Sequence, residues 1–145
     1  YINNVDYNDY NHLTIFLFLI PLLQSYIFGC YNYLYITSIW VSCGFSYHYS
    51  LYKTKRYTTI VNIFRTLDIF SIHTLIPYII YKSLFGNIYF VCGILCVKLL
   101  LILYYVYPKI YNIAIPHFII HIIASCGVWF SINSCYINKQ ICDLC

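Results

Sequence analysis

The sequence predicts an all-α protein, a polytopic transmembrane helical bundle of about five helices. Of its 145 residues, 62% are hydrophobic and only 8% are charged, whereas soluble domains carry about 25% charged residues. So few charges cannot cover a globule with polar surface, which favours a membrane environment. Five apolar runs follow one another, each near the roughly 20 residues that a helix needs to cross a bilayer.

Polar segments between the runs justify each predicted helix boundary. "GCYN" ends the first run, in which Pro21 should kink the helix. "KTKRY", a cationic segment, ends the second and more polar run. "KSLFGN" and "PKIYN" enclose the fourth run. We therefore expect helices, in chain order, over 13–28, 33–52, 59–81, 88–107 and 113–132.

One domain is expected, made of a polar leader (1–12), a transmembrane domain (13–132) and a polar, Cys-containing tail (133–145). The chain begins at Tyr1 and lacks methionine, so an initiator or targeting segment before it is left open. The cysteines of the apolar runs should be small buried hydrophobes. Those of the tail should be disulfide-bonded if the tail faces an oxidising compartment, or inert thiols otherwise. The first group is Cys30, Cys43, Cys92, Cys96 and Cys126, and the second is Cys135, Cys142 and Cys145.

The distribution of cations predicts an orientation. Alternating helices place the loop 53–58 and the segment after the fourth helix on one side, which holds Lys53, Lys55, Arg56 and Lys109, with Arg65 near its edge. The opposite side holds Lys82 and Lys139. Because cytoplasmic loops are enriched in Lys and Arg, we expect the loop 53–58 and the N-terminus to face the cytosol or the matrix.

Four polar residues are predicted to share one leaflet. A mid-span carboxylate such as Asp68 costs on the order of 2.5–3.5 kcal/mol, so it needs a functional reason. His48 lies near the end of the second predicted helix, and Asp68 lies in the first half of the third. His117 and His121 lie near the start of the fifth. Alternating helix directions bring all four to the same side of the bundle.

These residue types predict a zinc site. In "HFIIH", His117 and His121 stand at i and i+4 and share a helix face. With His48 they would form a three-histidine zinc site that keeps one coordination position open. Such sites activate water and polarise carbonyls for hydrolysis of amides and esters. Asp68 would orient a histidine or act as a base.

Blander interpretations of the same residues remain open. His12 and His73 fit hydrogen-bonding core residues better than metal ligands. Asp68 could instead form an ion pair with Arg65, three residues earlier on the same helix.

The quoted stretches "GFSYHYS", "FRTLDIFSI", "LIP" and "HFIIH" resemble the CREST superfamily of membrane hydrolase-like proteins. That group includes hemolysin III proteins, progestin and adipoQ receptors and alkaline ceramidases. The resemblance implies zinc bound by His48, His117 and His121, a catalytic Asp68, and hydrolysis of a lipid amide or ester. It therefore implies membrane lipid as a partner.

Two departures from the family pattern stand out. The family has a serine four residues before the helix-two histidine, and here that position is Gly44. The family also has three spans between the aspartate helix and the final histidine helix, whereas this chain has one. Losing two spans preserves helix direction, so the site should survive, but catalysis is less secure than metal binding.

Two other functions compete with a zinc hydrolase or a degenerate relative of one. The same histidines could be haem ligands in a haem- or quinone-binding subunit of a respiratory complex. The chain could also be a non-catalytic structural subunit that packs against partner proteins in an organellar membrane. Nucleic-acid binding is not expected, because the cations form no basic tract with interleaved aromatic residues.

Overall fold

The computed structural model describes residues 13–83, 87–103 and 114–145, apart from the side chains of residues 80 and 114–117. Every regular element within these residues is helical, which confirms the all-α prediction. Several predicted features lie outside the described part: the leader 1–12 with His12, the segment 104–113 with Lys109, and the side chain of His117.

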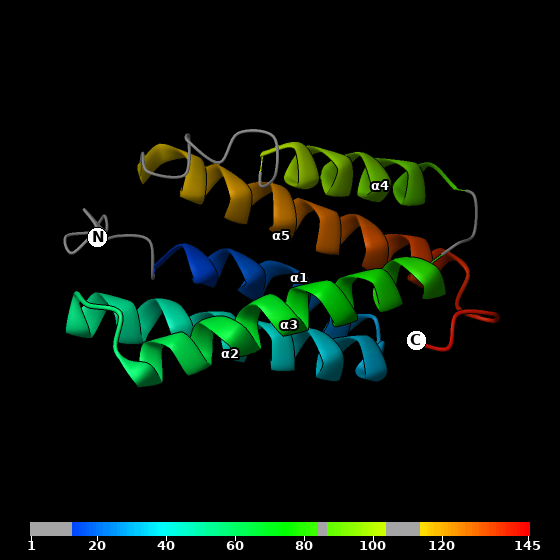
Figure 1. Cartoon of the computed structure of the whole chain (residues 1–145). Coiled ribbons are helices and arrows are strands. Elements are labelled where there is room, and N and C mark those ends of the chain that lie inside the picture. Colours follow the sequence, from blue (N-terminus) through cyan, green and yellow to red (C-terminus); the bar gives the residue numbers. More distant parts are fainter. Residues whose placement is uncertain (1–12, 84–86, 104–113) are drawn as a thin grey trace.

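The helices follow the predicted order, and the first three lie within about two residues of their predicted bounds, whereas the last continues to Ile137, inside the predicted tail. A 3₁₀-helix η1 (Leu13–Phe18) continues into α1 (Leu19–Ile27), and the others are α2 (Tyr31–Thr54), α3 (Thr59–Lys82), α4 (Ile88–Leu101) and α5 (Ala114–Ile137). Their directions alternate along the bundle (Figure 1). We call the end with the α2–α3 connection the loop end, and the end with the C-terminal tail the tail end.

Two helix pairs form the bundle, with the first helix between them. The most extensive contacts join α2 to α3 and α4 to α5, and η1–α1 touches both α2 and α5 (Figure 1). Direct contact between α3 and α5 is slight. The first helix is therefore the main connection between the two pairs.

The turn after α1 requires a glycine. Gly29 has φ of +70°, which an L side chain rarely adopts. The backbone N–H of Gly29 donates to the carbonyl of Tyr26 at 3.1 Å, and that of Cys30 donates to Ser25 at 2.9 Å. This Schellman arrangement satisfies carbonyls at the helix end and redirects the chain into α2.

Side-chain caps begin the next helices. The hydroxyl of Thr58 accepts from the backbone N–H of Val61 at 3.2 Å, at the start of α3. The side chain of Asn87 accepts from the N–H of Phe90 at 3.0 Å, at the start of α4. Both caps satisfy otherwise unpaired N–H groups at the first helical turn.

Pro21 creates a contact that holds the first helix against α5. A proline has no N–H to donate to the carbonyl four residues earlier, here that of Leu17. The Ser125 hydroxyl of α5 donates to the Leu17 oxygen at 2.9 Å, and the helix changes from 3₁₀ to α between Phe18 and Leu19. The gap left by the proline therefore becomes a link between η1 and α5.

Cys30 is fully buried, as expected, but it is disulfide-bonded to Cys145 and is therefore not a free thiol. Cys30 lies in the Schellman turn, and the C-terminal tail folds back against it. The tail cysteines Cys135 and Cys142 form a second disulfide. The remaining cysteines, all in helices, are free thiols, and their expected burial was wrong, since three are half-buried and the last is exposed: Cys43, Cys92, Cys96 and Cys126.

Polar side chains lie inside this fold beside a buried apolar core that includes Phe18, Trp40 and Ile132, and many large apolar side chains face outward. Two histidines and eight Ser or Thr residues are buried: His48, His121, Thr14, Ser25, Thr37, Ser71, Ser83, Ser125, Ser131 and Ser134. Many Leu, Ile, Phe and Tyr side chains are exposed along the helices, among them Phe16, Leu23, Ile63, Phe70 and Leu95. Soluble domains usually bury the apolar residues and expose the polar ones.

Two helices of the described part are long and apolar enough to cross a membrane, judged by length and composition: Thr59–Ile79 and Phe118–Ile137. Two further apolar helices, Leu13–Ile27 and Ile88–Leu101, are shorter. Helix α2 has 24 residues but is more polar. Membrane association is therefore supported weakly, and the five-span bundle remains a prediction.

Candidate functional site

Two buried imidazoles meet at the centre of the candidate site. His48 of α2 is 3% exposed, and His121 of α5 is 8% exposed. Their ring centroids lie 5.0 Å apart, with the planes nearly perpendicular. The counting of helix directions predicted that these residues share one leaflet, and the structure brings them into contact.

The 3₁₀-helix η1 supplies the surroundings of His121. The hydroxyl of Thr14 is hydrogen-bonded to Nδ1 of His121. The Phe18 ring lies 6.1 Å from the His121 ring and packs edge-to-face on Trp40 at 4.8 Å. One imidazole nitrogen is thus paired with a hydroxyl, while aromatic rings exclude water from that side.

Asp68 of α3 approaches α2 one helical turn from His48. A Cβ atom built on Gly44 would lie 3.2 Å from Oδ1 of Asp68, so the carboxyl sits close against a helix surface that lacks a side chain. Asp68 makes no ion pair with Arg65, which the alternative interpretation required. The Arg65 guanidinium instead lies 5.8 Å from the centre of the Tyr57 ring.

Two further histidines, His117 and His73, lie on α5 and α3. The backbone of His117 lies in the first turn of α5, one turn before His121, and its side chain is outside the described part. His73 of α3 is exposed, and its Nδ1 is bonded to the carbonyl of Ile69 at 2.8 Å. The expectation that His73 belongs to the core was therefore wrong, although its hydrogen bond was expected.

Among the side chains that the structure describes, no three His, Cys, Asp or Glu groups gather closely enough to hold a metal ion. The His48–His121 pair by itself would offer two nitrogen ligands. The predicted third ligand, His117, belongs to the side chains outside that description.

Two residues that contribute to this site were not identified from sequence. Thr14 could have been found, because counting helix directions puts the start of the first helix at the same end as the other candidates. Gly44 was noted for the missing serine, but its closeness to Asp68 depends on how α2 and α3 are rotated about their axes. Sequence periodicity carries little information on that rotation in helices that are apolar all round.

Within the described residues, the fold is all-helical, with two candidate membrane-spanning helices and a buried histidine pair near the loop end. Comparison of the chain with protein-family models, curated proteins and solved structures finds no match.

We predict that Gly44→Ser is more stable than Gly44→Ala. Either Cβ would approach the Asp68 carboxyl closely, but the serine hydroxyl can donate to it. A hydrogen bond to a charged acceptor contributes about 1.5–3 kcal/mol, which outweighs the lower helix propensity of serine. Thermal unfolding of both purified variants in detergent measures the difference. An alanine variant as stable as the serine variant would contradict the placement of Asp68 beside α2.

Proposed function

We propose that this chain is a zinc-binding integral membrane protein and a metal-dependent hydrolase of a lipid amide or ester, built on the pattern of the CREST superfamily. The observation that carries the proposal is the contact between the His48 and His121 rings. These two residues come from helices that are distant in sequence, and the sequence pattern predicts both as metal ligands.

The ring geometry fits two ligands of one zinc ion. Two imidazoles on a tetrahedral zinc, with Zn–N distances of about 2.0–2.1 Å, hold their ring centroids about 5 Å apart. The observed separation is 5.0 Å. Axial histidines on opposite faces of a haem iron are held further apart, so the pair favours zinc over the haem alternative.

His117 is the proposed third ligand. It precedes His121 by one turn of α5, and residues at i and i+4 lie on the same helix face. Three histidines leave one zinc position open, and a bound zinc ion then supplies Lewis-acid activation of water and of a substrate carbonyl.

Thr14 is proposed as a positioning residue for His121. Its hydroxyl is bonded to Nδ1, so Nε2 is the nitrogen that would bind the metal. Hydrogen bonds of this kind fix the tautomer and the orientation of a histidine ligand.

Asp68 is proposed as the group that handles the proton during hydrolysis. It lies against Gly44, one turn from His48, and no described residue donates a hydrogen bond or forms an ion pair with its carboxyl. A carboxyl without such a partner keeps its lone pairs for water or substrate, as a general base requires.

The distribution of polarity supports a membrane environment. Buried Ser, Thr and His with exposed Leu, Ile and Phe match bundles in lipid, where small and polar residues mediate helix contacts. With the loop 53–58 and the N-terminus facing the cytosol or matrix, the histidine pair would lie beneath the cation-rich surface.

One observation favours a partner protein as well. Helix α3 exposes Asn62, Thr66 and Thr74 on its outer side, and only 11% of its candidate span is buried. The threonine hydroxyls are bonded to backbone carbonyls of α3, but an exposed amide such as that of Asn62 is costly against lipid. A non-catalytic subunit that packs α3 against another membrane protein is therefore the second candidate function.

We predict about one zinc per chain in the purified full-length protein. His48→Ala, His117→Ala and His121→Ala should each reduce the zinc content strongly, because three ligands are needed to hold the ion. His73→Ala is the matched control, since this histidine is exposed on α3 and its Nδ1 is bonded to the carbonyl of Ile69. Elemental analysis of the monodisperse protein gives the stoichiometry.

Wild-type protein that stays metal-free after incubation with zinc would refute the proposal, as would full zinc retention in His121→Ala. Sharp visible bands in the reduced protein would instead support a haem subunit.

We predict that Asp68→Asn keeps its zinc but loses lipid hydrolysis by at least about 100-fold, because general-base catalysis contributes about 10²–10⁴-fold. A fluorogenic ceramide and a fluorogenic phospholipid ester, presented in mixed micelles, measure activity. Unchanged turnover in Asp68→Asn would remove Asp68 from catalysis without affecting zinc binding.

We predict that Thr14→Val weakens zinc binding about 10–100-fold, the usual cost of removing the hydrogen bond behind a ligand. Thr14→Ser keeps the hydroxyl and should restore the affinity. Competition with a zinc chelator measures both variants. Equal affinities for valine and serine would show that the hydroxyl does not position His121.

A further inference from the structure

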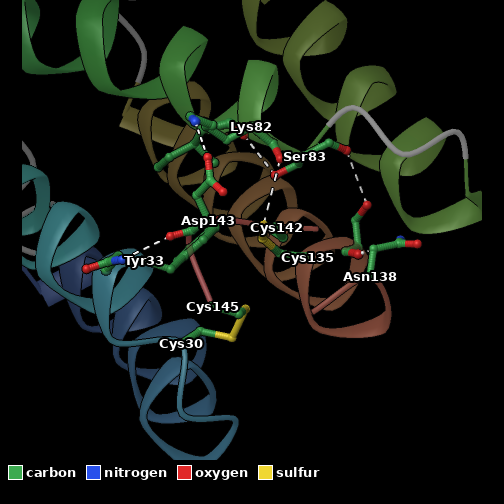
Figure 2. The surroundings of a disulfide bond; sticks show 12 residues. Cys30, Tyr33, Lys82, Ser83, Cys135, Asn138, Cys142, Asp143 and Cys145 are labelled. Carbon is green, nitrogen blue, oxygen red and sulfur yellow. Dashed lines mark hydrogen bonds and ion pairs between the residues drawn. A yellow bond between two sulfur atoms is a disulfide. The ribbon is translucent and has the colours of Figure 1, made fainter. Parts of the chain in front are cut away.

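The tail end carries a chemistry that the proposed hydrolase does not use. Four of the eight cysteines gather there in two disulfides, Cys30–Cys145 and Cys135–Cys142 (Figure 2). We propose that the tail end faces an oxidising compartment, in which the C-terminal tail (138–145) is a disulfide-closed strap that ties α2, α3 and α5 together.

Contacts other than the disulfides also hold the strap on α2. The side-chain amide of Asn32 donates to the carbonyl of Asp143 at 2.9 Å. The backbone N–H of Tyr33 donates to the carbonyl of Leu144 at 3.1 Å, and the Leu144 side chain is 1% exposed. The tail is thus docked by its neighbours as well, and this docking brings Cys145 to Cys30.

The strap also contacts the end of α3. Asp143 forms an ion pair with Lys82, and this hydrogen bond raises the pKa of Lys82 (Figure 2). The sulfur of Cys142 lies 3.7 Å from the carbonyl oxygen of Lys82. The eight residues of the strap therefore link the start of α2, the end of α3 and the end of α5.

The strap makes a covalent connection where packing is slight. Helices α2 and α3 pack on each other, α4 and α5 pack on each other, and α3 touches α5 only weakly. Cys30 and Cys145 are 115 residues apart in the sequence, so their bond closes a loop that contains all four helices. Closing a long loop restricts the unfolded chain and favours the folded bundle.

Forming the two bonds requires an oxidant. Each pair of thiols loses two protons and two electrons as its S–S bond forms, and a disulfide donor takes them up to become two thiols. Thiol–disulfide oxidation of this kind proceeds in the endoplasmic reticulum lumen, the periplasm and the cell exterior, whereas the cytosol keeps thiols reduced.

The cations at the loop end independently support the same orientation. Lys53, Lys55 and Arg56 are exposed at the loop end, and cations of short loops mark the cytoplasmic side. Disulfides at one end and cations at the other give the same orientation from unrelated physics. The free cysteines, among them Cys43 and Cys126, lie along the helices between the two ends.

The first test counts oxidised thiols in the full chain. Membranes are denatured in the presence of N-ethylmaleimide so that every free thiol is blocked, and the protein is then reduced and labelled with a polyethylene-glycol maleimide that adds mass for each new thiol. We expect four labels in the wild type and in the control Cys43→Ser, and two in Cys145→Ser or Cys135→Ser. No labels, or peptide mapping that joins Cys30 to another cysteine, would overturn the proposal.

The second test reads the orientation and does not depend on the bonds. The chain has no Asn-x-Ser/Thr glycosylation acceptor of its own. One acceptor is appended after Cys145 through a spacer, or inserted in the loop 53–58, and each form is translated with microsomes of the endoplasmic reticulum. Glycosylation of the tail form alone is expected, and glycosylation of the loop form alone would overturn the proposal.

The strap's mechanical role has its own measurement. Reduction should lower the melting temperature of the wild type by about 5 °C or more, and should leave the Cys30→Ser/Cys135→Ser double variant unchanged. An equal melting temperature before and after reduction of the wild type would show that the bonds do not tie the helices. None of these assays involves zinc or hydrolysis, so their outcome is separate from that of the proposed function.

Discussion

The contact between the His48 and His121 imidazoles constrains the whole loop end of this protein. Two polar rings that are withdrawn from water and set among apolar neighbours are costly unless their nitrogens are paired. Thr14 meets this need on one nitrogen of His121. The hydroxyl must therefore come from an element lying beside α5, and η1 is that element.

The position of η1 depends in turn on a missing donor. Pro21 cannot pair with the carbonyl of Leu17, and Ser125 of α5 donates to it instead. Ser125 lies one turn after His121 on α5, so the two hydrogen bonds from α5 to η1 stand on neighbouring turns. Together these hydrogen bonds fix the position of η1 along α5 and its rotation about its own axis. They thereby also fix the position of Thr14. A proline that seemed only to disturb a helix is thus part of the support of the site.

The sequence predicted the number, order and approximate bounds of the helices, because long apolar runs form helices and the polar segments between them form the turns. It also predicted which residues share an end, because alternating directions follow from the count of helices. It did not predict which way a side chain faces. His73 was expected inside and is exposed, while Thr14 lay at the right depth and was overlooked.

The pairing of the cysteines in disulfides could not be predicted from the sequence, for a different reason. Cysteine spacing does not determine connectivity, and Cys30 stands next to an apolar run in which a free thiol is ordinary. Its partner became evident only when the Schellman turn at Gly29 and the docked tail brought Cys145 alongside. Local turn geometry and a distant tail had to be combined.

Gly44 bears differently on the two parts of the proposed function, zinc binding and hydrolysis. Close packing of α2 against α3 requires a small residue beside Asp68, and both glycine and the family's serine satisfy that requirement. The hydroxyl is what the glycine lacks. The proposed metal binding depends on the histidines, which keep their contact without that hydroxyl, whereas the proposed proton transfer depends on the surroundings of the carboxyl. The missing serine should therefore alter the rate of hydrolysis and its dependence on pH while leaving zinc in place.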